Sequence, residues 1–175
     1  KSQMDLELNY KNFIHSHQDK RGTLKKIFNH KIFSRSFDMK KIYQVNLSYN
    51  PKKGTIRGLH FQMSKYSESK IVYCLSGKII DVIVDLRSNS KNIYKCYKKI
   101  LSSKKNDFMY VPKGFAHGFQ VLEKNTNLLY FHDKPYSINS SQTINPFDPY
   151  LKIKWPLNVT EISKNDLNAD FIKNV

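Results

Sequence analysis

The chain has 175 residues, 39% of them hydrophobic and 13% aromatic, which is enough apolar material for one folded domain and excludes a disordered chain. It contains no run of about 18 apolar residues, so the sequence predicts no membrane-spanning helix. Its 30 Lys and Arg against 14 Asp and Glu give a net charge of +16, which favours an anionic partner such as nucleic acid, a membrane surface or a phosphorylated small molecule.

The basic residues are scattered in short groups, such as DKRGTLKK at 19–26 and SSKKND at 102–107. Most groups fall at predicted turns, and none forms a basic helix or an arginine-rich stripe. A nucleic-acid-binding protein usually gathers its charge on one face. We therefore expect neither nucleic acid nor a membrane as partner, and each single basic run is also explained as part of a solvated loop.

Targeting and cysteine signals point to the cytoplasm. The N-terminal KSQMDLELNY lacks the apolar core of a signal peptide. Cys74 and Cys96 show no metal-binding or redox spacing, so free thiols in a reducing cytosol are expected.

The middle of the chain has the pattern of short β-strands. IYQVNLSY, at 42–49, alternates apolar and polar residues, and SKIVYCLSGKIIDVIVDLR predicts two strands, 71–75 and 79–86, around a turn at Ser76-Gly77. Four further segments continue the series: NIYKCYKKILS, DFMYVP, GFAHGFQVLE and NLLYFHD. Many short strands with turn signals about every 8–12 residues predict an all-β sandwich or barrel, such as a jelly roll.

Helical periodicity is weak until ISKNDLNADFI, at 162–172. This segment predicts a short helix with Ser163 as N-cap and Asp166 at its third position. No internal repeat, linker or low-complexity segment interrupts the chain. We therefore expect one domain over residues 1–175.

Two strands carry residues that a core alone does not need. A lone histidine on a strand is usually structural, but in RGLHFQ, at 57–62, His60 follows Arg57, which is costly to bury without an anionic partner. Gly58, between them, permits a close approach of the chain.

The second such strand, VPKGFAHGFQV at 111–121, carries His117. Its Pro and Gly residues are expected to fix a turn. Phe115 and Phe119 are expected to wall a pocket around the histidine.

RGLHFQ, KIVYCLSGKIIDVIVDLRSNS, VPKGFAHGFQVL, LLY and IKWPL…ISKND together resemble the dTDP-4-dehydrorhamnose 3,5-epimerase family, over roughly residues 13–170. The resemblance implies an all-β, cupin-type jelly roll with a short C-terminal helix, assembled as a homodimer. It implies inversion at C3, C5 or both of a 4-keto-6-deoxy sugar linked to a nucleoside diphosphate, without a metal or organic cofactor. The family makes deoxysugars for surface polysaccharides and natural products.

Epimerisation next to a ketone needs a base on one face of the carbon, an acid on the other and stabilisation of the enolate oxygen. The resemblance implies that His60 is the base, that Asp166 orients it and that Tyr130 is the acid. Lys70 is implied near the C4 oxygen. Each residue alone has a bland alternative, because Tyr130 is one of eleven tyrosines and Asp166 is also a helix-capping candidate.

The resemblance also implies a set of substrate-binding residues. His117 would lie beside the sugar, Arg57 would face the sugar or the diphosphate, and Tyr136 would pack by the nucleotide or the sugar. Gln44 and Asn46, in YQVN, would add further contacts.

The N-terminal DKRGTLKK departs from the family pattern D-x-R-G-F-F followed by an acidic residue. Arg21 matches and is expected to meet the nucleotide, but Leu24 replaces an aromatic residue and Lys26 stands where Glu is common. Thymine N3 donates a hydrogen bond and suits a carboxylate, whereas cytosine N3 accepts one and suits an ammonium. The departure raises the hypothesis that the nucleotide is not dTDP, with CDP one possibility.

Two other classes of function remain open from the sequence. Pro112, Gly114 and His117 fit the second motif of a metal-dependent cupin, but Gln62 stands where the first motif needs a histidine, and distant Glu68 would complete only a poor site. A non-catalytic sugar- or nucleotide-binding jelly roll would not need a base and an acid together.

The remaining histidines are interpreted as structural or surface residues. His132 and Asp133 do not form a pair, because neighbouring strand residues point to opposite faces. The other three are expected at the surface: His15, His17 and His30.

Overall fold

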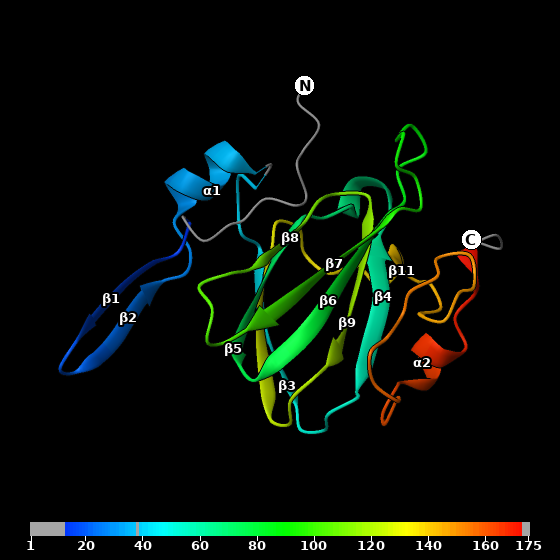
Figure 1. Cartoon of the computed structure of the whole chain (residues 1–175). Coiled ribbons are helices and arrows are strands. Elements are labelled where there is room, and N and C mark those ends of the chain that lie inside the picture. Colours follow the sequence, from blue (N-terminus) through cyan, green and yellow to red (C-terminus); the bar gives the residue numbers. More distant parts are fainter. Residues whose placement is uncertain (1–12, 38, 173–175) are drawn as a thin grey trace.

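The computed structural model describes residues 13–37 and 39–172 and consists mainly of two facing β-sheets (Figure 1). The four-stranded sheet has the order β3 (Gln44–Asn50), β10 (Thr126–His132), β5 (Lys70–Ser76), β8 (Met109–Val111). The five-stranded sheet has the order β11 (Ser141–Thr143), β4 (Ile56–Gln62), β9 (Phe115–Val121), β6 (Lys78–Asp85), β7 (Cys96–Ser102). Neighbouring strands are antiparallel throughout. The fold is a cupin-type jelly roll, as expected.

The predicted strands are confirmed to within a few residues. The turn between β5 and β6 lies at Gly77, whose φ is +75°. A Cβ there would lie 2.1 Å from Oγ1 of Thr126, so this position requires glycine on two grounds.

The resemblance implies N-terminal strands that are exchanged or packed across a dimer, but the sequence pattern did not predict where the N-terminal elements lie. They are a hairpin of β1 (His15–Asp19) and β2 (Gly22–Lys26), followed by α1 (His30–Ser36). The helix has only seven residues, too few to display a 3.6-residue period. Its N-cap, Asn29, accepts a hydrogen bond from the Ile32 N–H, and its buried Phe33 packs on the outer face of the four-stranded sheet.

The C-terminal segment covers the outer face of the five-stranded sheet. Ile144, Leu151 and Ile172 pack there against residues of β4, β6 and β9. The predicted helix is shorter than expected: α2 spans Lys164–Leu167. Ser163 is its N-cap and accepts a hydrogen bond from the Asp166 N–H (3.0 Å), as predicted.

The interior between the two sheets is apolar at one end and polar at the other. The apolar end is a cluster of buried side chains from both sheets: Val72, Cys74, Ile79, Ile83, Leu101, Met109, Val111, Phe115, Phe119, Val121, Leu128. Phe115 and Phe119 belong to this core, and the Phe119 ring lies 6.4 Å from that of His117, measured between centroids. That they wall a pocket stays a prediction. The polar end holds the candidate site.

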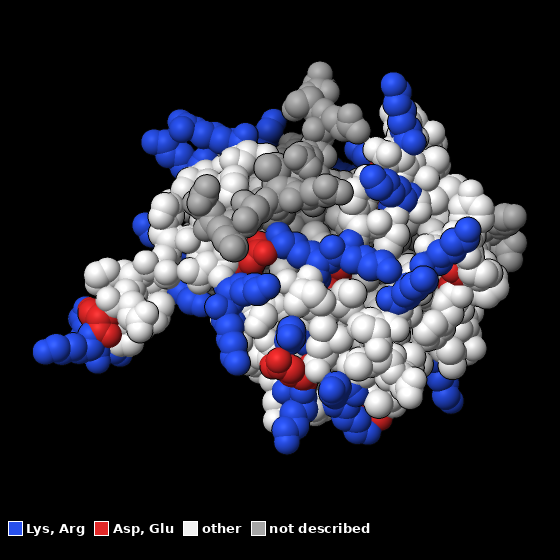
Figure 2. Space-filling view, viewed as in Figure 1, with Lys and Arg blue, Asp and Glu red and all other residues white. Residues whose placement is uncertain are grey.

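Lys and Arg side chains are spread across the face shown in Figure 2, from the N-terminal hairpin to the opposite side of the molecule. In the described part of the chain, no helix is long and apolar enough to cross a membrane. Cys74 and Cys96 are free thiols, and the surface placement of His15, His17 and His30 is confirmed.

Candidate active site

A bulge in β4 turns Arg57 and His60 to the same face of the sheet. Arg57 lies opposite Phe119 of β9 and His60 lies opposite His117, so three steps along β4 match two along β9. The extra residue moves His60 onto the inward face. This turn of the strand requires glycine at position 58. Its φ is +116°, and a Cβ there would lie only 2.6 Å from the Cα of Gly118.

His60 is held by a buried carboxylate. Its Nε2 donates to Oδ1 of Asp166 (2.7 Å), while Oδ2 accepts from the Gly58 N–H (3.1 Å). Burial raises the pKa of Asp166, but these hydrogen bonds and the imidazole outweigh it and hold the pKa below its usual value. Asp166 therefore stays ionised and keeps a proton on Nε2, which leaves Nδ1 of His60 free to accept one. The expected contact between base and orienting residue is present.

His117 forms a second imidazole–carboxylate pair one strand away. Its Nε2 donates to Oδ1 of Asp81 on β6 (2.7 Å), and both side chains are buried. Oδ2 of Asp81 is buried without a hydrogen-bond partner among the described residues. Sequence reasoning missed Asp81, although a carboxylate between Ile79 and Ile83 on the inward face of an apolar strand was a signal.

Tyr130 approaches from the opposite sheet. Its ring lies 6.2 Å from that of His117 and 6.1 Å from that of His132, measured between centroids. Burial raises the pKa of Tyr130 far above its usual value, and the negative charge of Asp81 raises it further. The phenol is therefore neutral and carries a proton that it can donate.

Lys70, Glu68 and His132 form a buried cluster beside Tyr130. Oε1 of Glu68 contacts Nζ of Lys70 (3.0 Å), and Oε2 accepts from Nδ1 of His132 (2.9 Å). The interpretation of His132 as merely structural was wrong, because it lines the same cavity as His60. Asp133 bonds instead to the Ser69 N–H (2.7 Å), so the absence of a His132–Asp133 pair was correctly expected.

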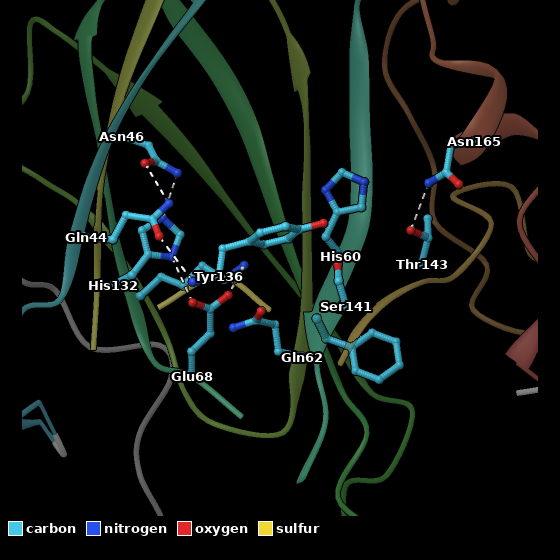
Figure 3. A pocket seen from close by; sticks show the side chains of 12 residues that line it. Gln44, Asn46, His60, Gln62, Glu68, His132, Tyr136, Ser141, Thr143 and Asn165 are labelled. Carbon is cyan, nitrogen blue, oxygen red and sulfur yellow. Dashed lines mark hydrogen bonds and ion pairs between the residues drawn. The ribbon is translucent and has the colours of Figure 1, made fainter. Parts of the chain in front are cut away.

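The cluster and His60 line a cavity of about 270 Å³ at the polar end of the barrel. Gln44, Asn46 and Tyr136 also line it, and in Figure 3 the Tyr136 side chain reaches across the pocket toward His60. These three expected binding residues are therefore brought to the site.

A second cavity of about 450 Å³ lies on the other side of His60 and is lined by Arg57 and Asp166. The Arg57 Nε donates to Oδ1 of Asn50 (2.9 Å).

Arg21 lies outside the pocket. It sits at the exposed tip of the β1–β2 hairpin, which projects from the barrel (Figure 1), and its guanidinium pairs with Asp19 (2.6 Å). Within one chain, the predicted contact of Arg21 with this site is therefore not formed.

The side-chain amide of Gln62 is used structurally. Its Nε2 donates to the carbonyls of Tyr66 and Pro135, and its Oε1 accepts from the Ser137 N–H (2.7 Å). Over residues 13–37 and 39–172, no three His, Cys, Asp or Glu side chains are grouped as metal ligands. The base and the ammonium thus line one cavity, and the neutral phenol of Tyr130 lies beside His132, which lines the same cavity. This combination suits proton transfer at a carbon next to a carbonyl.

Comparisons with known proteins agree with this chemistry. The family model described as dTDP-4-dehydrorhamnose 3,5-epimerase matches residues 10–174. A relative of that name from Shigella flexneri is 33% identical over 151 residues, which cover 86% of this chain and 83% of the relative.

Two solved structures are also similar. The dTDP-4-dehydrorhamnose 3,5-epimerase from Elizabethkingia anophelis has a TM-score of 0.86 and 35% identity, covering 92% of this chain and 89% of that one. A 3,5-epimerase from Legionella pneumophila, in complex with dTDP-4-keto-L-rhamnose, has a TM-score of 0.87 and 32% identity, covering 93% and 86%.

Proposed function

The chain belongs to the dTDP-4-dehydrorhamnose 3,5-epimerase family, and we propose that the polar end of its barrel is the active site, with His60 as base and Tyr130 as acid. The protein is an isomerase. It acts on a 4-keto-6-deoxy sugar linked to a nucleoside diphosphate, by removing a proton next to the ketone and returning one from the opposite face.

One observation carries the assignment of roles. His60 on the five-stranded sheet has a free Nδ1 and a charged orienting partner, while Tyr130 comes from the facing sheet as a neutral phenol. A sugar ring lying between the sheets would meet the base on one face and the acid on the other. That arrangement inverts a carbon centre without moving the ring.

The proposed reaction consists of two proton transfers at one carbon. Nδ1 of His60 takes the proton from C3 or C5, and the electron pair of the C–H bond moves onto the C4 oxygen as an enolate. The Lys70 ammonium stabilises that negative charge. Tyr130 then gives its proton to the same carbon from the other face, and exchange of both groups with solvent restores the starting state.

Binding of the substrate uses the remaining polar groups. Arg57 suits the diphosphate, because its guanidinium presents a fork of N–H donors to phosphate oxygens. His117 lies beside the sugar, and Tyr136, 62% exposed at the pocket mouth, provides a face for the base or the sugar. Gln44 and Asn46 line the same cavity as Tyr136 and provide further polar contacts.

A homodimer is the second part of the proposal. β3 is an edge strand whose outward face carries three exposed apolar side chains, Val45, Leu47 and Tyr49. Tyr43 comes just before the strand, and all four are between 51% and 66% exposed. Such a stripe on a sheet edge favours pairing with another chain. A second copy would also explain how Arg21, on its projecting hairpin, meets a nucleotide. Sedimentation equilibrium tests this, and a monomer at micromolar concentration would contradict it.

The whole chain would act as one epimerase domain in the cytoplasm, where Cys74 and Cys96 stay reduced, and would supply deoxysugars for polysaccharide or natural-product synthesis. The central experiment is incubation with 4-keto-6-deoxy nucleotide sugars in heavy water. Deuterium should enter C3, C5 or both. No exchange with any of several nucleotides would refute the proposed function.

A further inference from the structure

A chain of polar contacts links the pocket mouth to Lys70. The Tyr136 N–H donates to Oε1 of Gln44 (3.2 Å), and Nε2 of Gln44 donates to Oδ1 of Asn46 (2.9 Å). Nδ2 of Asn46 lies 3.4 Å from Nε2 of His132. Glu68 completes the chain, because its two oxygens contact His132 (2.9 Å) and Lys70 (3.0 Å).

The two ends of this series of contacts determine which group donates and which accepts in each hydrogen bond. A backbone N–H can only donate, so the Gln44 group that meets Tyr136 is its oxygen, and its amide N–H₂ faces Asn46. Asn46 therefore turns its own N–H₂ to His132. His132 must accept at Nε2 and carry its proton on Nδ1, which is the donor that the Glu68 carboxylate needs.

The charges agree with this direction. The side chains of Glu68, Lys70 and His132 are 7%, 9% and 11% exposed, so an uncompensated charge among them would be costly. Burial raises the pKa of Glu68, but the hydrogen bond from His132 and the charge of Lys70 hold it below its usual value. A carboxylate, an ammonium and a neutral imidazole leave the cluster with no net charge.

We propose that Glu68 and His132 are positioning residues for the epimerisation: they hold the Lys70 ammonium in place and couple its position to Asn46 and Gln44 at the mouth. This inference rests on the role of Lys70 in the proposed function. Glu68 is the only group joining Lys70 to His132 among the contacts of the described residues. Without the charge of Glu68, the buried Lys70 ammonium would lose its anchor and stand unpaired, which is costly.

The first test uses the unaltered protein and needs no activity. Nitrogen-15 NMR at a pH where histidines are neutral distinguishes imidazoles protonated at Nδ1 from those protonated at Nε2. The His132 signals are identified by their absence in His132→Asn. Protonation at Nδ1 is expected, and protonation at Nε2 would overturn the proposed network, whether or not the protein epimerises any sugar.

The second test compares variants by steady-state kinetics. Glu68→Gln keeps the shape but removes the charge, and its one amide oxygen can accept from Lys70 or from His132 but not from both. We expect kcat to fall about 10- to 100-fold while KM changes much less, as for a misplaced catalytic group. Glu123→Gln removes an exposed carboxylate elsewhere and is the matched control for loss of charge.

His132→Asn and His132→Phe separate positioning from packing. An asparagine amide can replace the Nδ1–H donor to Glu68, whereas phenylalanine keeps a ring but no donor. His132→Asn should therefore retain at least about tenfold more kcat than His132→Phe. Equal losses in the two variants, or an unchanged kcat in Glu68→Gln, would overturn the inference. Absence of exchange in the unaltered protein would instead refute the proposed function, and the tautomer measurement would still decide the network.

Discussion

Arg57 and His60 lie on the same inward face of β4 although they are three residues apart. In a regular strand this spacing would send them to opposite faces. The extra residue at the bulge removes the conflict, and Gly58 also donates its N–H to Asp166, the partner of His60. One glycine thus sets both the direction of the base and the position of its orienting carboxylate.

Replacing Gly58 with alanine should therefore damage both stability and activity. The position has φ +116° and no room for a Cβ against Gly118. We expect a loss of about 2–4 kcal/mol in the free energy of unfolding, from backbone strain plus overpacking. Urea denaturation measures it.

Gly22→Ala is the matched control for Gly58→Ala. Gly22 also has a positive φ, +125°, but nothing lies within 4 Å of its Cβ position. Strain alone should cost about 1–3 kcal/mol there, less than at Gly58. Equal losses at the two sites would show that the close approach of β4 to β9 is unimportant.

The sequence was sufficient to predict the strands, because their β-branched runs and Gly turns are local signals. The sequence was also sufficient to name residues expected around His60, because RGLHFQ and PKGFAHGF resemble the motifs of one family. It was insufficient for the N-terminal hairpin, whose ten strand residues are all exposed and carry no burial pattern.

The partners of the site histidines were harder to predict for a physical reason. The carboxylates of Asp81 and Glu68 each meet a histidine of a neighbouring strand in the same sheet, so the pairing depends on sheet register and not on sequence spacing. Alternation showed correctly that His132 and Asp133 face opposite ways. It did not show that the inward face at His132 is the pocket.

His60→Ala should abolish deuterium exchange into the sugar, because it removes the proposed base that lines the cavity. Tyr130→Phe should slow inversion more than exchange, since it removes the acid and spares the base. Loss of one proton-transfer group typically costs about 10²–10⁴ in rate. Proton NMR in heavy water follows exchange and inversion together. If Tyr130→Phe lost both equally, Tyr130 would not be a dedicated acid.

Asp166→Asn tests orientation of the base. The amide fills the same space, but it cannot both accept from the His60 Nε2–H and stabilise a positive imidazolium. We expect kcat to fall by about 10²-fold or more with folding retained. Asp170→Asn is the control, because it makes the same change at an exposed carboxylate of the same C-terminal segment. Unchanged activity in Asp166→Asn would remove this residue from the mechanism.

Stability should fall on acidification partly through Glu68. Its pKa is lowered in the folded state, so the unfolded chain binds the proton more readily. The stability that ionised Glu68 contributes is therefore fully present above the pKa of the unfolded chain, about 4.3. It is lost as the pH falls through the lower pKa of the folded state. Glu68→Gln should flatten the decline in unfolding free energy below about pH 5. An unchanged acid profile would mean that the cluster does not stabilise the ionised carboxylate.

The nucleotide is the remaining specificity question, and the N-terminal hairpin makes it testable. Lys26, an exposed ammonium on β2 where the family commonly has Glu, favours cytosine N3 over thymine N3 as a partner. We predict that CDP raises the melting temperature more than dTDP, GDP or UDP, since a ligand that binds only the native state stabilises it. At about 100 times its Kd, a nucleotide adds roughly 2.7 kcal/mol, or about 5–10 °C for a chain of this size. Lys26→Glu should shift the preference toward dTDP. Equal or tighter binding of dTDP by the unaltered protein in calorimetry would reject the hypothesis and place this chain with the dTDP-named relatives.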